Sequence, residues 1–288
     1  MWLPGVPGWQ ADPQPRPDAP MTLNSALLLG GCGGFGRAFA GRLRDAGVSV
    51  TTADVDQAAD VYCDVMADLT SVLEILPSVD LVLMCLSEPL AMQALDQLDA
   101  HVGADQVLVD ICSVKTNICA RAQERCVPAQ YLSLHPMFGP ERTFQDQNAV
   151  TITLRDGPQL AAFLSVLEGW GIRLLATDAS IHDQTTAMVQ VLAHATLLTF
   201  AQAQHDLEID ERLMDAMTTP IFRSLDATAQ GLLGENPQLY HYIQTANPHG
   251  AAARKVLSEA ATSVTQALGD AEVGRVIDLF ARLKRDPG

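Results

Sequence analysis

The stretch from Ser25 to Asp54 limits most strongly what this chain can fold into. Along it come an apolar strand-like run, a glycine-rich turn, a helical pattern, a second strand-like run and an acid, at 25–29, 30–36, 37–46, 48–53 and Asp54. A glycine turn between strand and helix, with an acid about 20 residues later, is typical of dinucleotide-binding units. The segment therefore predicts a strand–helix–strand unit that starts a parallel sheet.

Three glycines of that turn match the spacing GxGxxG. We assign Gly31 to the tight turn, Gly33 to the close approach of a pyrophosphate, and Gly36 to packing of the helix on the strand. Backbone amides at the helix start, around Gly34 and Phe35, would then hold the phosphates. The turn is thus predicted to bind a dinucleotide.

Asp54 ends the second strand, where a carboxylate accepts both ribose hydroxyls of NAD. A 2′-phosphate would meet this carboxylate without help, since residues 55–57 contain no arginine. NAD is therefore favoured over NADP. The same fingerprint can also seat the adenosyl part of another cofactor.

Strand and helix patterns continue to alternate up to about residue 176. Further strands are expected at 81–86, 106–111, 131–135, 149–154 and 173–176, and helices at 68–76, 89–98 and 158–170. This α/β alternation predicts a Rossmann-like, doubly wound, mostly parallel sheet, whose ligands bind beyond the carboxyl ends of the strands. Ser87, Ser113 and His135 each follow such an end, and Ser87 is grouped with the cofactor-binding residues.

Two short motifs at these strand ends carry the candidate chemistry. In DICSVK, residues 110–115, Ser113 could be a helix cap and Lys115 a solvated lysine of the first turn. In YLSLHPMFGPE, residues 131–141, a proline follows His135 and disfavours a helical conformation there. We therefore expect His135 to end its strand in extended form, with its ring at the mouth of a cleft.

From about residue 180 the pattern is helical to the end. The chain is thus divided into a disordered leader at 1–20, a dinucleotide-binding domain at 21–178 and an all-helical domain at 179–288. The first long helix, expected at 181–205, places polar residues four apart, hence along one face: His182, Thr186, Gln190 and His194. Such a row is either solvated or lines a cleft.

Composition and charge limit the kinds of partner that the protein can bind and the compartment in which it is expected. The formal net charge is −16 and Lys and Arg form no cluster, which argues against nucleic acid or an anionic membrane as partner. No apolar run approaches the ~20 residues that span a bilayer. The leader lacks a cationic start and an apolar core, so the cytoplasm is expected. The six cysteines form no CxxC pair, and no metal site is predicted.

Taken together, the motifs resemble the prephenate and arogenate dehydrogenases of tyrosine biosynthesis. The resemblance covers about residues 27–268 and is carried by GGCGGFG, DICSVK, LHPMFGP, the helix from His182 to His194, PIFR and NPQLY. It implies NAD-dependent removal of a hydride from ring carbon 4 of a small cyclohexadienol substrate, with loss of carbon dioxide and aromatisation. It also implies a helical domain that forms a homodimer and closes the substrate cleft.

By this resemblance, His135 is the catalytic histidine that accepts or polarises the proton of the 4-hydroxyl. Ser113 corresponds to the serine that binds the same hydroxyl and orients the histidine. Gln190 and His194 correspond to helix residues that face the substrate, and Tyr240 to an aromatic wall.

One position departs from the family pattern. The family usually has a substrate-binding arginine where this chain has Gly231, and such a charge-assisted bond is worth ~1.5–3 kcal/mol. Either Arg223, Arg142 or Lys115 replaces it, or the substrate differs, for example 4-amino-4-deoxyprephenate. Two alternatives remain open: a transferase using an adenosyl cofactor such as S-adenosylmethionine, and a non-catalytic ligand sensor.

Overall fold

The computed structural model describes residues 22–125, 128–269 and 272–284. The expected leader, residues 1–20, lies outside the described residues. The chain divides into two compact units, one up to His182 and the other from Asp183 onward.

The amino-terminal unit is built on one eight-stranded sheet with the order β3-β2-β1-β4-β5-β6-β7-β8. All neighbouring strands are parallel except β6 and β7, which pair antiparallel. The strands are β1 (Ser25–Leu29), β2 (Ser49–Asp54), β3 (Val61–Tyr62), β4 (Leu81–Met84), β5 (Val107–Asp110), β6 (Gln130–Pro136), β7 (Asn148–Arg155) and β8 (Arg173–Ala176). The predicted Rossmann-like, mostly parallel sheet is confirmed.

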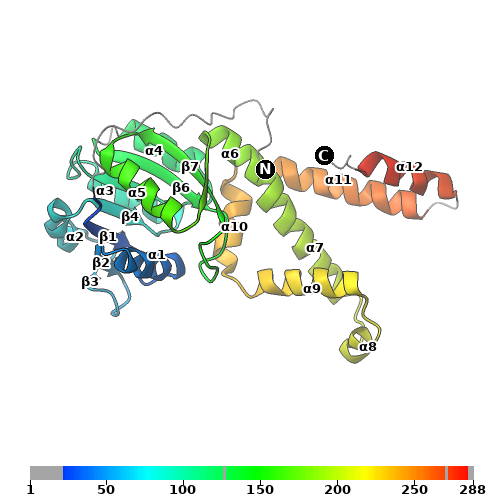
Figure 1. Cartoon of the computed structure of the whole chain (residues 1–288). Coiled ribbons are helices and arrows are strands. Elements are labelled where there is room, and N and C mark those ends of the chain that lie inside the picture. Colours follow the sequence, from blue (N-terminus) through cyan, green and yellow to red (C-terminus); the bar gives the residue numbers. More distant parts are fainter. Residues whose placement is uncertain (1–21, 126–127, 270–271, 285–288) are drawn as a thin grey trace. The chain divides into compact units, whose positions relative to one another are not determined.

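Helices cover both faces of this sheet (Figure 1). They are α1 (Gly34–Asp45), α2 (Thr70–Ile75), α3 (Glu88–Leu98), α4 (Thr116–Glu124) and α5 (Pro158–Gly169). One core cluster joins α2, α3 and α4 to one face, and a second joins α1 and α5 to the other. Because both faces are covered, the central strands β4 and β5 are buried throughout and apolar except for Asp110 at the end of β5, as is typical of parallel sheets.

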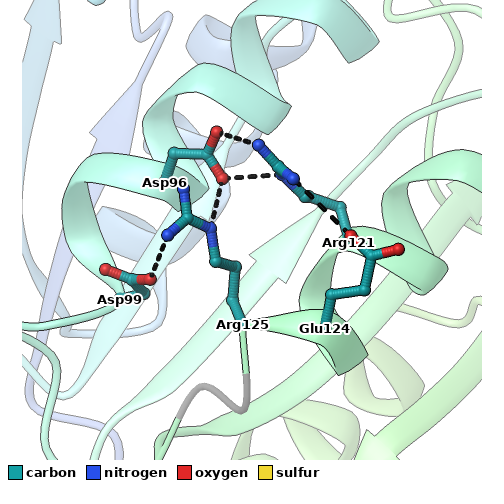
Figure 2. Close-up of polar contacts among 5 residues, drawn as sticks. All are labelled: Asp96, Asp99, Arg121, Glu124 and Arg125. Carbon is teal, nitrogen blue, oxygen red and sulfur yellow. Dashed lines mark hydrogen bonds and ion pairs between the residues drawn. The ribbon is translucent and has the colours of Figure 1, made fainter.

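Ion pairs tie α3 to α4 on the outside of the sheet (Figure 2). The Nε and Nη2 atoms of Arg121 donate to the two carboxylate oxygens of Asp96, at 2.8 and 2.6 Å. Arg125 donates to Asp96 at 2.8 Å and lies 3.4 Å from Asp99, while Arg121 lies 3.5 Å from Glu124. Burial opposes ionisation of Asp96, but the two guanidinium groups still lower its pKa. The cluster thus fixes α4, which begins directly after DICSVK.

The second unit is helical throughout its described residues, and the predicted all-helical domain is confirmed. It contains the end of α6 (Ala179–Thr186), a π-helical segment (Ala187–Leu192), α7 (Ala193–Asp206), α8 (Glu211–Ala216), α9 (Pro220–Leu233), α10 (Pro237–Ala246), α11 (Gly250–Leu268) and α12 (Val273–Leu283). Among the described residues, no helix is both long and apolar enough to cross a membrane.

The helix expected at 181–205 is present as α6 and α7, but its middle part, Ala187–Leu192, is π-helical. Wider turns remove backbone carbonyls from their usual partners, and buried carbonyls need new donors. Side chains near the end of α10 provide them: the Gln244 amide donates to the Val191 carbonyl at 2.9 Å, and the Asn247 amide donates to the Asp183 carbonyl at 2.9 Å. Since these donors lie more than 50 residues away, the helix's own sequence does not reveal the widening.

Candidate active site

The glycine turn between β1 and α1 leaves no room for side chains at its buried positions. A Cβ on Gly36 would overlap the Gly30 carbonyl oxygen, and one on Gly31 would lie 2.6 Å from the Thr52 Cβ. The left-handed position is Gly30, with φ of 74°, so the turn glycine precedes the predicted Gly31 by one residue. Gly31 is instead required for packing on β2.

The start of α1 is open to a ligand. Gly33 is its N-cap and offers no side-chain cap, and the first turn contains no acidic residue. Gly33 and Gly34 are exposed, as a phosphate approaching the helix start requires. The Phe35 ring packs edge-on against Phe138 of LHPMFGP at 6.0 Å between centroids. Packing thus brings two motifs about 100 residues apart in sequence to the same place.

Asp54 closes the other side of the turn. Its Oδ2 accepts from the Cys32 amide at 2.9 Å and its Oδ1 from the Asp56 amide at 3.1 Å. The half-buried carboxylate therefore stands beside the glycine turn, where it can accept ribose hydroxyls. Three features fit a dinucleotide without a 2′-phosphate. They are the glycine turn, which has no room for side chains at Gly31 and Gly36, the helix start without a side-chain cap, and the Asp54 carboxylate.

The remaining candidates of this unit lie at the carboxyl ends of three strands. Ser87 and Ser113 follow β4 and β5, and His135 is the last residue but one of β6. Ser87 is the exposed N-cap of α3, and its hydroxyl makes no capping bond. Ser113 is half-buried, and the N-cap of α4 is Lys115. The capping interpretation of Ser113 is therefore wrong, which leaves its hydroxyl available for another role.

Lys115 is not a solvated lysine. Its side chain is 0% exposed, and its Nζ lies 3.0 Å from Asp110 Oδ1 and donates to the Leu134 carbonyl at 2.7 Å. Tyr131 donates its hydroxyl to the other Asp110 oxygen at 3.1 Å. Lys115 thus neutralises a buried carboxylate and holds the residue before His135, so its position argues against the role of substrate-carboxylate cation.

The His135 ring is 3% exposed, so it does not stand at the mouth of a cleft as expected. Its Nδ1 lies 2.8 Å from Nε2 of His182, which is 2% exposed and comes from α6. Burial lowers the pKa of His135 well below its usual value, and the nearby Lys115 charge and His182 lower it further. The ring is consequently a neutral imidazole at neutral pH.

In the helical unit, His194 lies against Tyr240, edge to face at 4.8 Å. The buried Nδ1 of His194 has no hydrogen-bond partner among the described residues, and burial lowers the pKa of this histidine. Gln190 is half-buried within the π-helical segment. A polar atom buried without a partner costs about 1–3 kcal/mol, so the Nδ1 position of His194 suits a bound polar group.

The other candidate cations are exposed. Arg223 lies on α9, and no ion pair of its side chain is found among the described residues. Arg142 is 71% exposed and 3.4 Å from Glu141. A Cβ on Gly231 would meet nothing within 4 Å, so the site of the absent arginine is open space.

Comparison with known proteins decides the family. Residues 39–176 match the nucleotide-binding domain of prephenate dehydrogenase, and residues 178–282 match its dimerization domain. A 4-amino-4-deoxyprephenate dehydrogenase from Streptomyces pristinaespiralis is 31% identical over 264 residues, which are 90% of this chain and 89% of that protein. The chain belongs to the prephenate dehydrogenase family.

A further curated relative and two solved structures are similar to the chain. The T-protein of Enterobacter agglomerans is 32% identical over 76% of this chain, which spans 55% of that protein. The fold is shared with Synechocystis arogenate dehydrogenase (21% identity, TM-score 0.63, 90% of this chain and 98% of that one). The fold is also shared with A. aeolicus prephenate dehydrogenase in complex with hydroxyphenyl propionate and NAD+ (16% identity, TM-score 0.64, 91% of this chain and 98% of that one).

As a member of the prephenate dehydrogenase family, the chain is an oxidoreductase, and its cofactor is NAD, in agreement with the carboxylate of Asp54. One residue of the candidate site, His182, is not evident as such from the sequence. It belongs to the polar row on the helix, and the structure places it against His135. Its four-residue spacing from Thr186 was a signal, but its partner lies 47 residues away in sequence.

Proposed function

We propose that the chain catalyses NAD-dependent oxidative decarboxylation of a prephenate-like cyclohexadiene to an aromatic product. The observation that carries the proposal is the neutral, buried imidazole of His135, fixed through Nδ1, in the unit that holds the glycine turn and Asp54. A glycine turn by itself does not identify the reaction, because such turns occur in proteins with many different activities. A fixed neutral imidazole is the group that removal of the proton from the substituent on carbon 4 requires.

In the proposed reaction, His135 accepts or polarises the proton of the substituent on ring carbon 4 as the hydride departs from that carbon. NAD, when bound, accepts the hydride. The bond to the ring carboxylate then breaks, its electron pair enters the ring, and carbon dioxide leaves. A positioned general base contributes about 10²–10⁴-fold. Ser113 is proposed to bind the same substituent, and Gln190, His194 and Tyr240 to contact the substrate.

Among the three substrates, 4-amino-4-deoxyprephenate is favoured by the name of the Streptomyces relative and by Gly231. An alkyl amine is protonated at neutral pH, as a lysine amine is, with a pKa of about 10. It must lose a proton before its lone pair can assist hydride departure. A neutral imidazole has the lone pair needed to accept that proton, and the lowered pKa of His135 keeps this lone pair unprotonated at neutral pH. For the substrate carboxylate, Arg223 and Arg142 are the proposed cations, because Lys115 is already paired.

The test is NADH formation with prephenate, arogenate and 4-amino-4-deoxyprephenate. We expect the highest kcat/KM with the amino compound.

The variant Gly231→Arg adds a side chain into open space. We expect it to raise kcat/KM with prephenate by about 10–100-fold, which corresponds to the free energy of one charge-assisted hydrogen bond. No NADH with any of the three would overturn the proposal, and calorimetric binding of S-adenosylmethionine without NAD would favour the transferase.

We also propose a homodimer formed through the helical unit, in the cytoplasm. On α12, Val273, Ile277, Phe280 and Leu283 are 61–70% exposed and recur at helical spacing, while Leu279 is buried. An apolar stripe of this kind is typical of an interface between subunits. It belongs to the part of the chain that matches a dimerization domain.

For the dimer, we expect light scattering to give twice the chain mass, and Phe280→Asp to yield monomers because it places a charge in the apolar stripe. The exposed Glu259→Gln on α11 serves as a control. A wild-type monomer would contradict the proposal.

A further inference from the structure

We propose that His182 is a positioning residue that holds His135 in its reactive tautomer and shares the proton His135 takes up. This inference rests on the proposed function of His135 as the base. It concerns a residue from a different element, α6, whose ring reaches the end of β6.

The contact between the two rings is a direct one. The Nδ1–Nε2 separation of 2.8 Å lies within the range of a hydrogen bond, and the ring planes are inclined by 59°. Both side chains are at least 97% buried, so water does not compete for these nitrogens. The hydrogen bond therefore fixes the orientation of the His135 ring.

A hydrogen bond between two neutral imidazoles contains one proton, which can belong to either ring. If His135 donates from Nδ1, its Nε2 carries a lone pair and can act as a base. If His182 donates instead, His135 carries its proton on Nε2 and can only donate there. The reactive arrangement thus requires His182 to accept through Nε2.

The same bond offers a place for the proton taken from the substrate. A cation on His135 would be buried, beside the strand end where Lys115 binds the Leu134 carbonyl. When a new N–H bond forms at Nε2 of His135, its Nδ1–H bond can break as an N–H bond forms at Nε2 of His182. The positive charge is then distributed over two rings, and protons balance. A buried charge is stabilised by such delocalisation.

Two substitutions separate these roles. In His182→Gln, an amide oxygen can still accept from Nδ1 of His135 but cannot take up a proton, whereas His182→Leu removes the acceptor. We expect kcat to fall about 10-fold in the glutamine variant and about 100-fold in the leucine variant, with KM and NAD affinity nearly unchanged. The exposed His101→Gln is the matched control. Wild-type kcat in both variants would overturn the inference.

Nitrogen NMR on the unmodified protein provides a readout that does not depend on a variant folding or on turnover. We expect His135 to carry its proton on Nδ1, with Nε2 unprotonated. A proton on Nε2 instead would overturn the inference. Lack of activity with all three substrates in wild type would count against the proposed function, while the tautomer would still be decided by this measurement.

Discussion

A His135→Asn variant is expected to lose about two to four orders of magnitude in kcat while it keeps its affinity for NAD. Asparagine places an amide near the position of Nδ1, so the contact with His182 can persist and the strand end can keep its shape. What disappears is the base at Nε2. Steady-state kinetics with the best substrate and calorimetry with NAD measure the two quantities separately.

The control for this experiment is His101→Asn, a substitution at an exposed histidine of the same unit. It should leave kcat and NAD affinity within about twofold of wild type, since exposed positions tolerate change. An unchanged kcat in His135→Asn would contradict the catalytic role. Equal losses of turnover and NAD binding would assign His135 a structural role instead.

The pH dependence of activity and of stability follows from the lowered pKa of His135. Burial, Lys115 and His182 lower the pKa of His135 in the folded protein, whereas the unfolded value is about 6.5. The neutral base therefore persists as pH falls through 6.5, and kcat/KM should decline only at lower pH. Between the two values the unfolded chain binds the extra proton, so this histidine makes stability fall as pH drops below about 6.5.

The second large effect is expected on stability. Replacing Lys115 with methionine keeps the bulk of the side chain but leaves the Asp110 carboxylate, which is 0% exposed, without its cation. Breaking a buried pair in this way costs about 3–5 kcal/mol, and we expect Tm to fall by roughly 10 °C. Denaturant unfolding followed by circular dichroism measures the loss.

Two further variants test whether the loss of stability comes from leaving Asp110 without its cation. Lys255→Met removes a lysine that is 76% exposed and 3.8 Å from Glu259, and it should cost less than about 0.5 kcal/mol. In the double variant Asp110→Asn, Lys115→Met, the amide can still accept from the Cys112 amide, so part of the stability should return. The double variant should also lose activity at a higher pH than wild type, because the Lys115 charge no longer lowers the pKa of His135. If Lys115→Met were no more destabilising than Lys255→Met, the buried pair of Lys115 and Asp110 would not be a main contributor to stability.

The parts of the fold that were predicted correctly from sequence depend on short stretches of chain. Gly36 and Asp54 belong to one strand–helix–strand unit, whose geometry is set by backbone conformations and apolar periodicity within about 30 residues. The parallel sheet followed from the regular alternation of such patterns. The same alternation placed Ser113 after a strand and His135 at the carboxyl end of one, at the edge where ligands of doubly wound sheets bind, and His135 is the last residue but one of β6.

The sequence by itself therefore determined the doubly wound sheet, the dinucleotide turn and the edge at which the candidate residues lie. Only the tertiary structure decided that Lys115 is buried against Asp110, that His182 meets His135, and that the helix widens between Ala187 and Leu192. The reason is physical: the pattern of a segment reflects its own backbone and burial, whereas each of these features depends on donors and acceptors that folding brings from distant segments.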